Sequence, residues 1–303
     1  MNSISRKFKI VDVLLLAMAI LPLVVAMVLK IFFTPPTDGV EVSGAIIYFT
    51  IPMPLQDFPI TESQVNSTFV LITVLFVCLY LTHGIRANVP TKRALIAEWA
   101  VESLDKLVEE NMGDYFTAFP PFIGAIMAIS AFSSLLSLLG LFAPTSDINI
   151  VAGWAILVFF LITYFKLKAG PIVYIKSFGE PVKLLAPINI ISEFATPVSM
   201  AFRHYGNVLS GSVIAVLLAT AFTGLSNMVL GWLPGFLGDI PLLRVGIPAI
   251  LSLYFDVFSG LLQAFIFAML TMMYVSGGFP ADEYEKRKIK KAQKKLQEQN
   301  AKA

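Results

Sequence analysis

Residues 185–223 read LAPINIISEFATPVSMAFRHYGNVLSGSVIAVLLATAFT, and this stretch decides the fold class. Only Glu193 and Arg203 in it are charged at neutral pH. A helix rises about 1.5 Å per residue, so the stretch would extend about 60 Å, twice the thickness of the bilayer hydrocarbon. The sequence therefore predicts a membrane helix that must tilt strongly, break, or emerge from the bilayer.

The composition of the whole chain agrees with a membrane protein. Its 303 residues are 57% hydrophobic and 14% charged, with a mean hydropathy of +0.79, whereas charged residues make up about a quarter of a soluble protein. These values exclude a water-soluble enzyme. The single cysteine, Cys78, excludes an internal disulfide and a cysteine-ligated metal cluster.

Six apolar stretches have the length that a membrane helix needs, and their Leu, Ile, Phe and Ala without strict alternation favour helices over a membrane barrel. The chain is predicted to be an all-α, polytopic integral membrane protein, with two long tilted C-terminal helices. The six stretches are Ile10–Phe33, Asn66–Ile85, Phe119–Phe142, Ile150–Phe165, Leu185–Thr223 and Leu242–Ser276.

Basic residues indicate the orientation, because Lys and Arg accumulate on the cytoplasmic side. Nineteen of the 22 lie in the two tails and in the segments 86–113 and 166–183. The alternate segments 34–65, 143–149 and 224–241 have none. We expect a multi-pass protein of the cell inner (plasma) membrane with both termini cytoplasmic.

The remaining segments complete the expected organisation. The first stretch could be a cleaved signal peptide, but its uncharged run is longer than a signal core and no small-residue cleavage site follows, so we expect a retained helix. Apolar residues of 91–108 recur at helical spacing, which predicts an amphipathic helix at the interface. We divide the chain into an N-terminal helix with an acidic loop (1–65), a membrane domain (66–280) and a basic cytoplasmic tail (281–303).

Arg203 is the most unusual residue of the chain. It lies near the middle of an apolar segment, where an Arg costs about 2.5–3.5 kcal/mol on insertion scales and cannot lose its proton. At three- and four-residue spacing it shares a polar stripe of small residues, namely Ser199, Gly206, Asn207 and Ser210. Close helix packing explains the small residues but not the Arg.

The sixth stretch has a matching stripe, made of Ser252, Asp256, Ser259, Gly260 and Gln263. An intramembrane Asp either relays an ion or pairs with a nearby cation. A permanent Arg203–Asp256 pair is the simpler alternative, although it would explain neither the polar surroundings nor the excess helix length. His204 should point about 100° away from Arg203. With only two histidines and no phosphate-binding loop, we expect no metal, no cofactor and no nucleic-acid partner.

Several motifs resemble those of subunit a of F-type ATP synthases. Residues 188–211, INIISEFATPVSMAFRHYGNVLSG, resemble the family signature that ends in R-L-[FY]-G-N. APTSDIN (143–149), LQAFIFA (262–268) and VPTK (89–92) are similar to its other motifs. The resemblance covers about 58–278 and leaves the N-terminal helix outside.

The resemblance implies a role for each matching residue. Arg203 takes the place of the essential stator arginine, Asn207 and Gln263 are its usual polar neighbours, and Glu193 resembles the acid of the cytoplasmic access path. Asp256 takes a position where relatives often have His or Glu. Ser212 takes a position where many relatives have an acid or His. Ser199, Gly206 and Ser210 would pack against the ring.

The family also implies partners and a mechanism. The chain would be a stator subunit that passes H⁺ or Na⁺ through two offset half-channels to carboxylates of a rotating c-ring. It would assemble with the b subunits of the peripheral stalk and the remaining F1Fo subunits, and its basic tail would contact membrane lipid. The alternatives are a secondary ion transporter with Arg203, Asp256 and Glu193 as its own ion site, or a structural anchor, which leaves Arg203 without a purpose.

Overall fold

Helices dominate the chain, as the sequence predicted. The structure, a computed structural model, describes residues 2–34, 44–54, 56–83, 85, 92–168, 170–180, 182–230, 250–251 and 253–300. Within them, six helices are long and apolar enough to cross a membrane. Their limits agree with the six predicted stretches to within a few residues, except that 242–249 lie outside the described residues.

The N-terminal part is a pair of helices joined by a small β-hairpin. Helix α1 (Asn2–Phe33) packs along α2 (Glu62–Thr82), and the Thr73 hydroxyl donates to the Ala19 carbonyl at 3.0 Å. Strand β1 (Ile47–Ile51) pairs antiparallel with β2 (Phe58–Thr61). The sequence predicted no structure for this loop.

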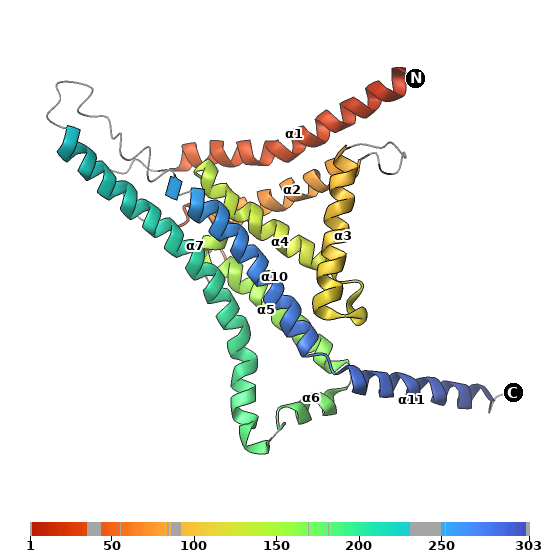
Figure 1. Cartoon of the computed structure of the whole chain (residues 1–303). Coiled ribbons are helices and arrows are strands. Elements are labelled where there is room, and N and C mark those ends of the chain that lie inside the picture. Colours follow the sequence, from red (N-terminus) through yellow and green to blue (C-terminus); the bar gives the residue numbers. More distant parts are fainter. Residues whose placement is uncertain are drawn as a thin grey trace.

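Helix α3 (Lys92–Met112) is the predicted amphipathic helix, and it lies across one end of the bundle (Figure 1). Val108 and Met112 are buried against the core, whereas Ile96 and Trp99 are exposed. Only the C-terminal half of the predicted apolar face therefore packs inside the protein. The exposed half is free to enter lipid headgroups.

Two membrane helices follow, connected by short 3-10 turns. Helix α4 (Pro120–Leu135) continues into η3 (Leu136–Leu139), and η4 (Pro144–Ser146) precedes α5 (Ile148–Leu167). The Asp147 carboxylate caps α5 by accepting from the Asn149 backbone N–H at 3.0 Å. The short turn η4 contacts the ends of both helices, and α10 packs against each of them.

After α6 (Pro171–Ser177) and η5 (Lys183–Leu185), helix α7 (Ala186–Leu230) runs for 45 residues, or about 67 Å. Figure 1 shows that it bends on the outside of the bundle. Pro197 lies inside the helix, where it removes one backbone hydrogen bond. The excess length predicted from the sequence is thus accommodated by one long, bent helix.

The last membrane helix starts with an irregular turn. Residues Tyr254–Ser259 form a π-helical turn (η6), which leads into α10 (Gly260–Gly277) and the polar helix α11 (Ala281–Asn300). Single π-turns inside helices are rare and frequently lie at functional sites. The π-turn contains Asp256.

The core lies between α4, α5 and α10, and α3 closes one end of it. Its buried centre includes Ile123, Val158, Phe267 and Met272. Phe116, Phe119, Phe165 and Phe279 pack in mostly edge-to-face contacts near the start of α11. Only part of α7 is covered by this core, so much of the helix has an open face.

Candidate functional site: two polar pockets and an exposed arginine

The polar stripe of α7 lies on its open face. Ser199, Arg203, Asn207 and Ser210 are exposed, and a Cβ added to Gly206 would meet no atom within 4 Å. Among the described residues, Arg203 has neither an ion-pair partner nor a hydrogen bond. The guanidinium therefore projects from the described structure with no counter-charge beside it.

His204 holds the opposite face of α7 against the core. Its ring is fully buried, its Nε2 lies 3.3 Å from the Ser130 hydroxyl, and it contacts Trp154 and Phe267 edge-on. Neighbouring helix positions differ by about 100°, so seating His204 inward turns Arg203 outward. His204 is therefore an anchor that orients the Arg.

One turn beyond Arg203, α7 is bonded to α10. The Asn207 side-chain amide donates to Gln263 Oε1 at 2.7 Å, and Gln263 is 2% exposed. These are the two residues that the family resemblance gives as polar neighbours of Arg203. The bond fixes the height of the Arg relative to α10.

Asp256 lines a pocket of about 520 Å³, here called the Asp256 pocket. The Ser137 hydroxyl interacts with its half-buried carboxylate. Ser212 also lines this pocket, and its hydroxyl donates to the Leu209 carbonyl at 2.8 Å. Among the described residues, the Asp256 carboxylate has no ion-pair partner. Further polar and small lining residues are Ser134, Ser146, Tyr205, Ser259 and Gly260.

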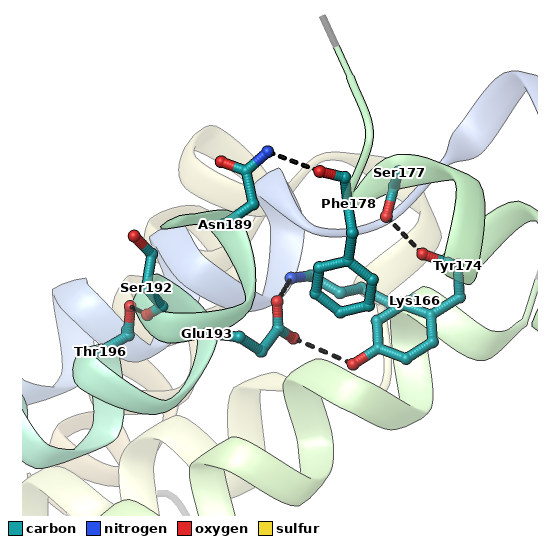
Figure 2. Close-up of polar contacts among 8 residues, drawn as sticks. All are labelled: Lys166, Tyr174, Ser177, Phe178, Asn189, Ser192, Glu193 and Thr196. Atoms are coloured by element: carbon teal, nitrogen blue, oxygen red, sulfur yellow. Dashed lines mark hydrogen bonds and ion pairs between the residues drawn. The ribbon is translucent and has the colours of Figure 1, made fainter. Parts of the chain in front are cut away.

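Glu193 lines a second pocket of about 490 Å³, here called the Glu193 pocket. Figure 2 shows that Lys166 and Tyr174 point toward its carboxylate. The Lys166 amine lies 2.6 Å from Glu193 Oε2, and the Tyr174 hydroxyl donates to Oε1 at 3.4 Å. Burial, together with the nearby Glu193 carboxylate, raises the pKa of Tyr174 above its ordinary value.

The α7 side of this second pocket is polar and is bonded to the loop before α7. The Asn189 amide donates to the Phe178 carbonyl at 2.8 Å, and the Thr196 hydroxyl donates to the Ser192 carbonyl at 2.9 Å (Figure 2). Asn189, Ser192 and Thr196 all line the pocket. The pocket wall is thus hydrophilic along nearly two turns of α7.

The two pockets lie at opposite ends of the bundle. The Glu193 pocket is formed by the start of α7 and the ends of α5 and α10, and the Asp256 pocket by the middle of α7, the π-turn and the end of α4. Along α7, the Glu193 pocket ends at Thr196 and the Asp256 pocket begins at Tyr205. Arg203 lines neither, and it lies between them.

This placement bears on the predicted site. The fixed Arg203–Asp256 pair is not formed in the described structure, and Asp256 and Glu193 occupy different pockets. Ser252 lies outside the described residues. In the described ranges, no cluster of three His, Cys, Asp or Glu side chains could hold a metal ion.

Sequence reasoning missed several groups that line the pockets. Lys166 counted only as a basic residue of a connecting segment, and Tyr174 and Ser137 were not singled out. Residues 166 and 193 belong to different helices, so no spacing within one helix could predict the pair. A lysine at the end of an apolar stretch was the one available signal.

Fold and site together define a polytopic helical membrane protein with a polar pocket at each end and, between them, an arginine that has no ion-pair partner among the described residues. The chain belongs to the ATP synthase A chain family, whose family model matches residues 65–276. It is 31% identical over 285 residues to the sodium ion specific ATP synthase subunit a of Propionigenium modestum, covering 84% of this chain and 90% of that protein.

Other relatives carry the same family name. ATP synthase subunit a of Bacillus pumilus is 33% identical over 224 residues, covering 69% of this chain and 88% of the relative. That of Legionella pneumophila (strain Paris) is 26% identical over 227 residues, covering 74% and 89%. The chain is accordingly a multi-pass membrane subunit of the ion-channel stator part of an F1Fo ATP synthase, and it acts within that complex.

Proposed function

We propose that this subunit conducts H⁺ or Na⁺ through two offset half-channels, to and from carboxylates of a rotating c-ring, with Arg203 between the half-channels. The observation that carries the proposal is the exposed guanidinium between two separate pockets, which has no ion-pair partner in the part of the chain that the structure describes. A charge costs free energy in hydrocarbon, and it is retained where a passing anion meets it.

Arg203 would force each ring carboxylate to release its ion. A nearby cation favours the ionised form of a carboxylate, so a loaded ring site loses its ion as it approaches the guanidinium. The same positive charge repels a free cation that would otherwise pass directly between the pockets. Ions must therefore travel with the ring.

The pockets supply the two access paths. A cation from the outer side reaches the ring through the Asp256 pocket, passing Asp256, Ser212 and the Asn207–Gln263 bond, and leaves through the Glu193 pocket on the cytoplasmic side. The membrane potential supplies about 2.3 kcal/mol per charge per 100 mV. Ser199, Gly206 and Ser210 form the narrow strip against which the ring turns.

The remaining assignments rest on the family and on charge. The subunit lies in the cell inner membrane with both termini cytoplasmic, and it contacts the c-ring and the b subunits of the peripheral stalk. The basic helix α11 is attracted to anionic lipid. The Propionigenium modestum relative is sodium ion specific, so dependence on Na⁺ is the first property to measure for this chain.

Arg203→Ala tests the proposal directly. The complete complex is reconstituted in vesicles, and ATP-driven ion pumping is measured together with assembly. We expect the variant to assemble and pumping to be abolished. Arg287→Ala, which removes an arginine outside the membrane-spanning helices, is the control and should pump normally. Normal coupled pumping by Arg203→Ala would overturn the proposal.

An autonomous transporter is less well supported. Such a protein needs Arg203, Asp256 and Glu193 around one shared ion, but the two acids line pockets at opposite ends of the bundle. Ion transport by the purified subunit without a ring would be the result that favours it.

A further inference from the structure

Helix α1 contributes to the wall of the Asp256 pocket, although it precedes the residues that the family model matches. The contribution comes from Lys30, in its last turn. α1 packs along α2, and this contact places its end beside the connection between α4 and α5. The pocket of this chain thus has a cationic group that comes from outside the matched family core.

Lys30 is paired with a deeply buried acid. Its amine lies 3.3 Å from Glu62 Oε1, and the two side chains are 32% and 2% exposed. The same oxygen accepts a hydrogen bond from the Phe142 backbone N–H at 3.2 Å. Lys30 is therefore the member of the pair that faces the pocket, while Glu62 is held behind it.

The surroundings of Glu62 contain further ionisable groups. Burial and the Glu62 carboxylate raise the pKa of Tyr48 to about 12, so this neighbour stays neutral. Asp147 accepts a hydrogen bond from Ser63, the residue next to Glu62. Lys30 is the cation paired with Glu62 in the described structure, so losing either partner leaves the other uncompensated.

We propose that the Lys30–Glu62 pair sets the electrostatic potential of the Asp256 pocket and thereby the rate at which cations reach Asp256. The inference rests on the proposed use of this pocket as an ion path. With both charges present the pocket wall is nearly neutral, and a cation proceeds to Asp256. Without Glu62, Lys30 repels cations; without Lys30, Glu62 concentrates them. Lys30 is thus a positioning residue of the access path.

A purely structural role makes a different prediction. If the pair only fastens α1 to the α4–α5 connection, then Lys30→Met and Glu62→Gln weaken the same contact and change any readout in the same direction. If the pair sets the potential, the two variants have opposite effects and the double variant cancels them. The sign of the change therefore decides between the two roles.

The local potential can be measured without ion transport. Ser212→Cys, in a Cys78→Ser background, places a single thiol in the pocket of the assembled complex. Its modification rates with a cationic and an anionic methanethiosulfonate of similar size give a ratio that reports the sign of the potential. We expect Lys30→Met to raise the cation-to-anion ratio about three- to tenfold and Glu62→Gln to lower it by a similar factor.

Two control variants preserve the charge balance of the pair. The double variant Lys30→Met/Glu62→Gln should return to within about twofold of the parent, and Lys30→Arg should keep the parent ratio, because both preserve the charge balance. The differences should shrink at high salt. Unchanged ratios, or shifts of both single variants in one direction, would overturn the proposal. If Lys30→Met fails to assemble, Glu62→Gln is compared with the double variant: a lowered ratio that the double variant restores supports the proposal, and a ratio that stays shifted in the double variant overturns it.

Transport then links the potential to function. Glu62→Gln should raise the outer cation concentration that gives half-maximal ion-driven ATP synthesis by about three- to tenfold, and the double variant should restore it. A shift in the electrostatic potential of the pocket without a change in this half-maximal concentration would overturn the link to ion access. Pumping by Arg203→Ala would instead overturn the proposed function, and the thiol ratios would still test the pocket potential.

Discussion

The Asp256 and Glu193 pockets have similar volumes, about 520 and 490 Å³, but their acids are held differently. Glu193 is paired with Lys166 at 2.6 Å, and its side chain is 8% exposed. Asp256 lies in a π-turn and, in the described structure, has a serine hydroxyl rather than a cation beside it. A paired carboxylate holds a passing cation weakly, whereas an unpaired one attracts it. The difference suits ion release at the Glu193 pocket and ion uptake at the Asp256 pocket.

The largest expected effect comes from changing Arg203, the proposed barrier between the two pockets. Arg203→Lys keeps a positive charge but replaces the fixed guanidinium with a compact ammonium that can lose its proton. We expect coupled ion pumping to fall by about two orders of magnitude, as measured in vesicles that contain the assembled complex. Pumping within twofold of the parent would show that charge alone suffices and that the guanidinium has no special role.

Exchanging each acid for its amide tests the contrast between the pockets. Asp256→Asn should slow ion uptake from the outer side by about tenfold or more, and Glu193→Gln should mainly slow release to the cytoplasmic side. Passive ion flux measured in both directions separates the two steps, and a pull-down of partner subunits controls for assembly. Equal effects of both variants in both directions would contradict the assigned division.

A substitution at Gly260 changes the wall of the Asp256 pocket and leaves the Glu193 pocket unaltered. A Cβ on Gly260 would lie 2.5 Å from the Ser134 Cβ, so Gly260→Ala should force α4 and α10 apart and destabilise the subunit by about 1–3 kcal/mol. The thermal stability of the complex measures this effect. Gly153→Ala is the matched control, because a Cβ at Gly153 would meet no described atom within 4 Å and stability should be unchanged. A stable Gly260→Ala complex would show that the helices yield at this contact.

Lys166→Met tests whether the Glu193 pocket needs its cation. Without the Lys166 amine, the buried Glu193 carboxylate loses its ion-pair partner. Glu193 should then hold ions longer, and ion release should slow about three- to tenfold. Lys166→Arg preserves the charge and should retain most of the flux. The concentration dependence of ion release is the measurement, and an unchanged profile for Lys166→Met would remove Lys166 from the path.

The smallest effect is expected for Tyr174→Phe. The hydroxyl contributes one long hydrogen bond of 3.4 Å to Glu193, so flux should change by less than about twofold. Because the pKa of Tyr174 is raised above its ordinary value, the hydroxyl stays protonated around neutral pH and the effect should not vary there with pH. A pH-dependent difference between the variant and the parent would contradict this.

The sequence anticipated what depends on neighbours along one helix. Helical spacing predicted that Arg203 and His204 face different directions, and the apolar composition predicted the length of α7; which of the two residues is buried came from the structure. The family resemblance implied that Asn207 and Gln263 are polar neighbours of Arg203, and the hydrogen bond between them is a finding of the structure. The sequence predicted that the apolar face of α3 lies at the membrane interface; Ile96 and Trp99 are exposed in agreement with this, whereas Val108 is buried, because the core reaches the C-terminal half of that helix.

By itself, the sequence determined that the chain is a helical membrane protein. In lipid, the backbone N–H and C=O groups of apolar stretches of this length must be hydrogen-bonded within the protein, and a helix satisfies them. It also determined that Arg203 lies within such a stretch. Only the tertiary structure decided which acid is paired and which is not, since Lys166 and Glu193, or Lys30 and Glu62, come from different helices. Ion pairs between helices depend on packing distances, and these distances exist only after the bundle has formed.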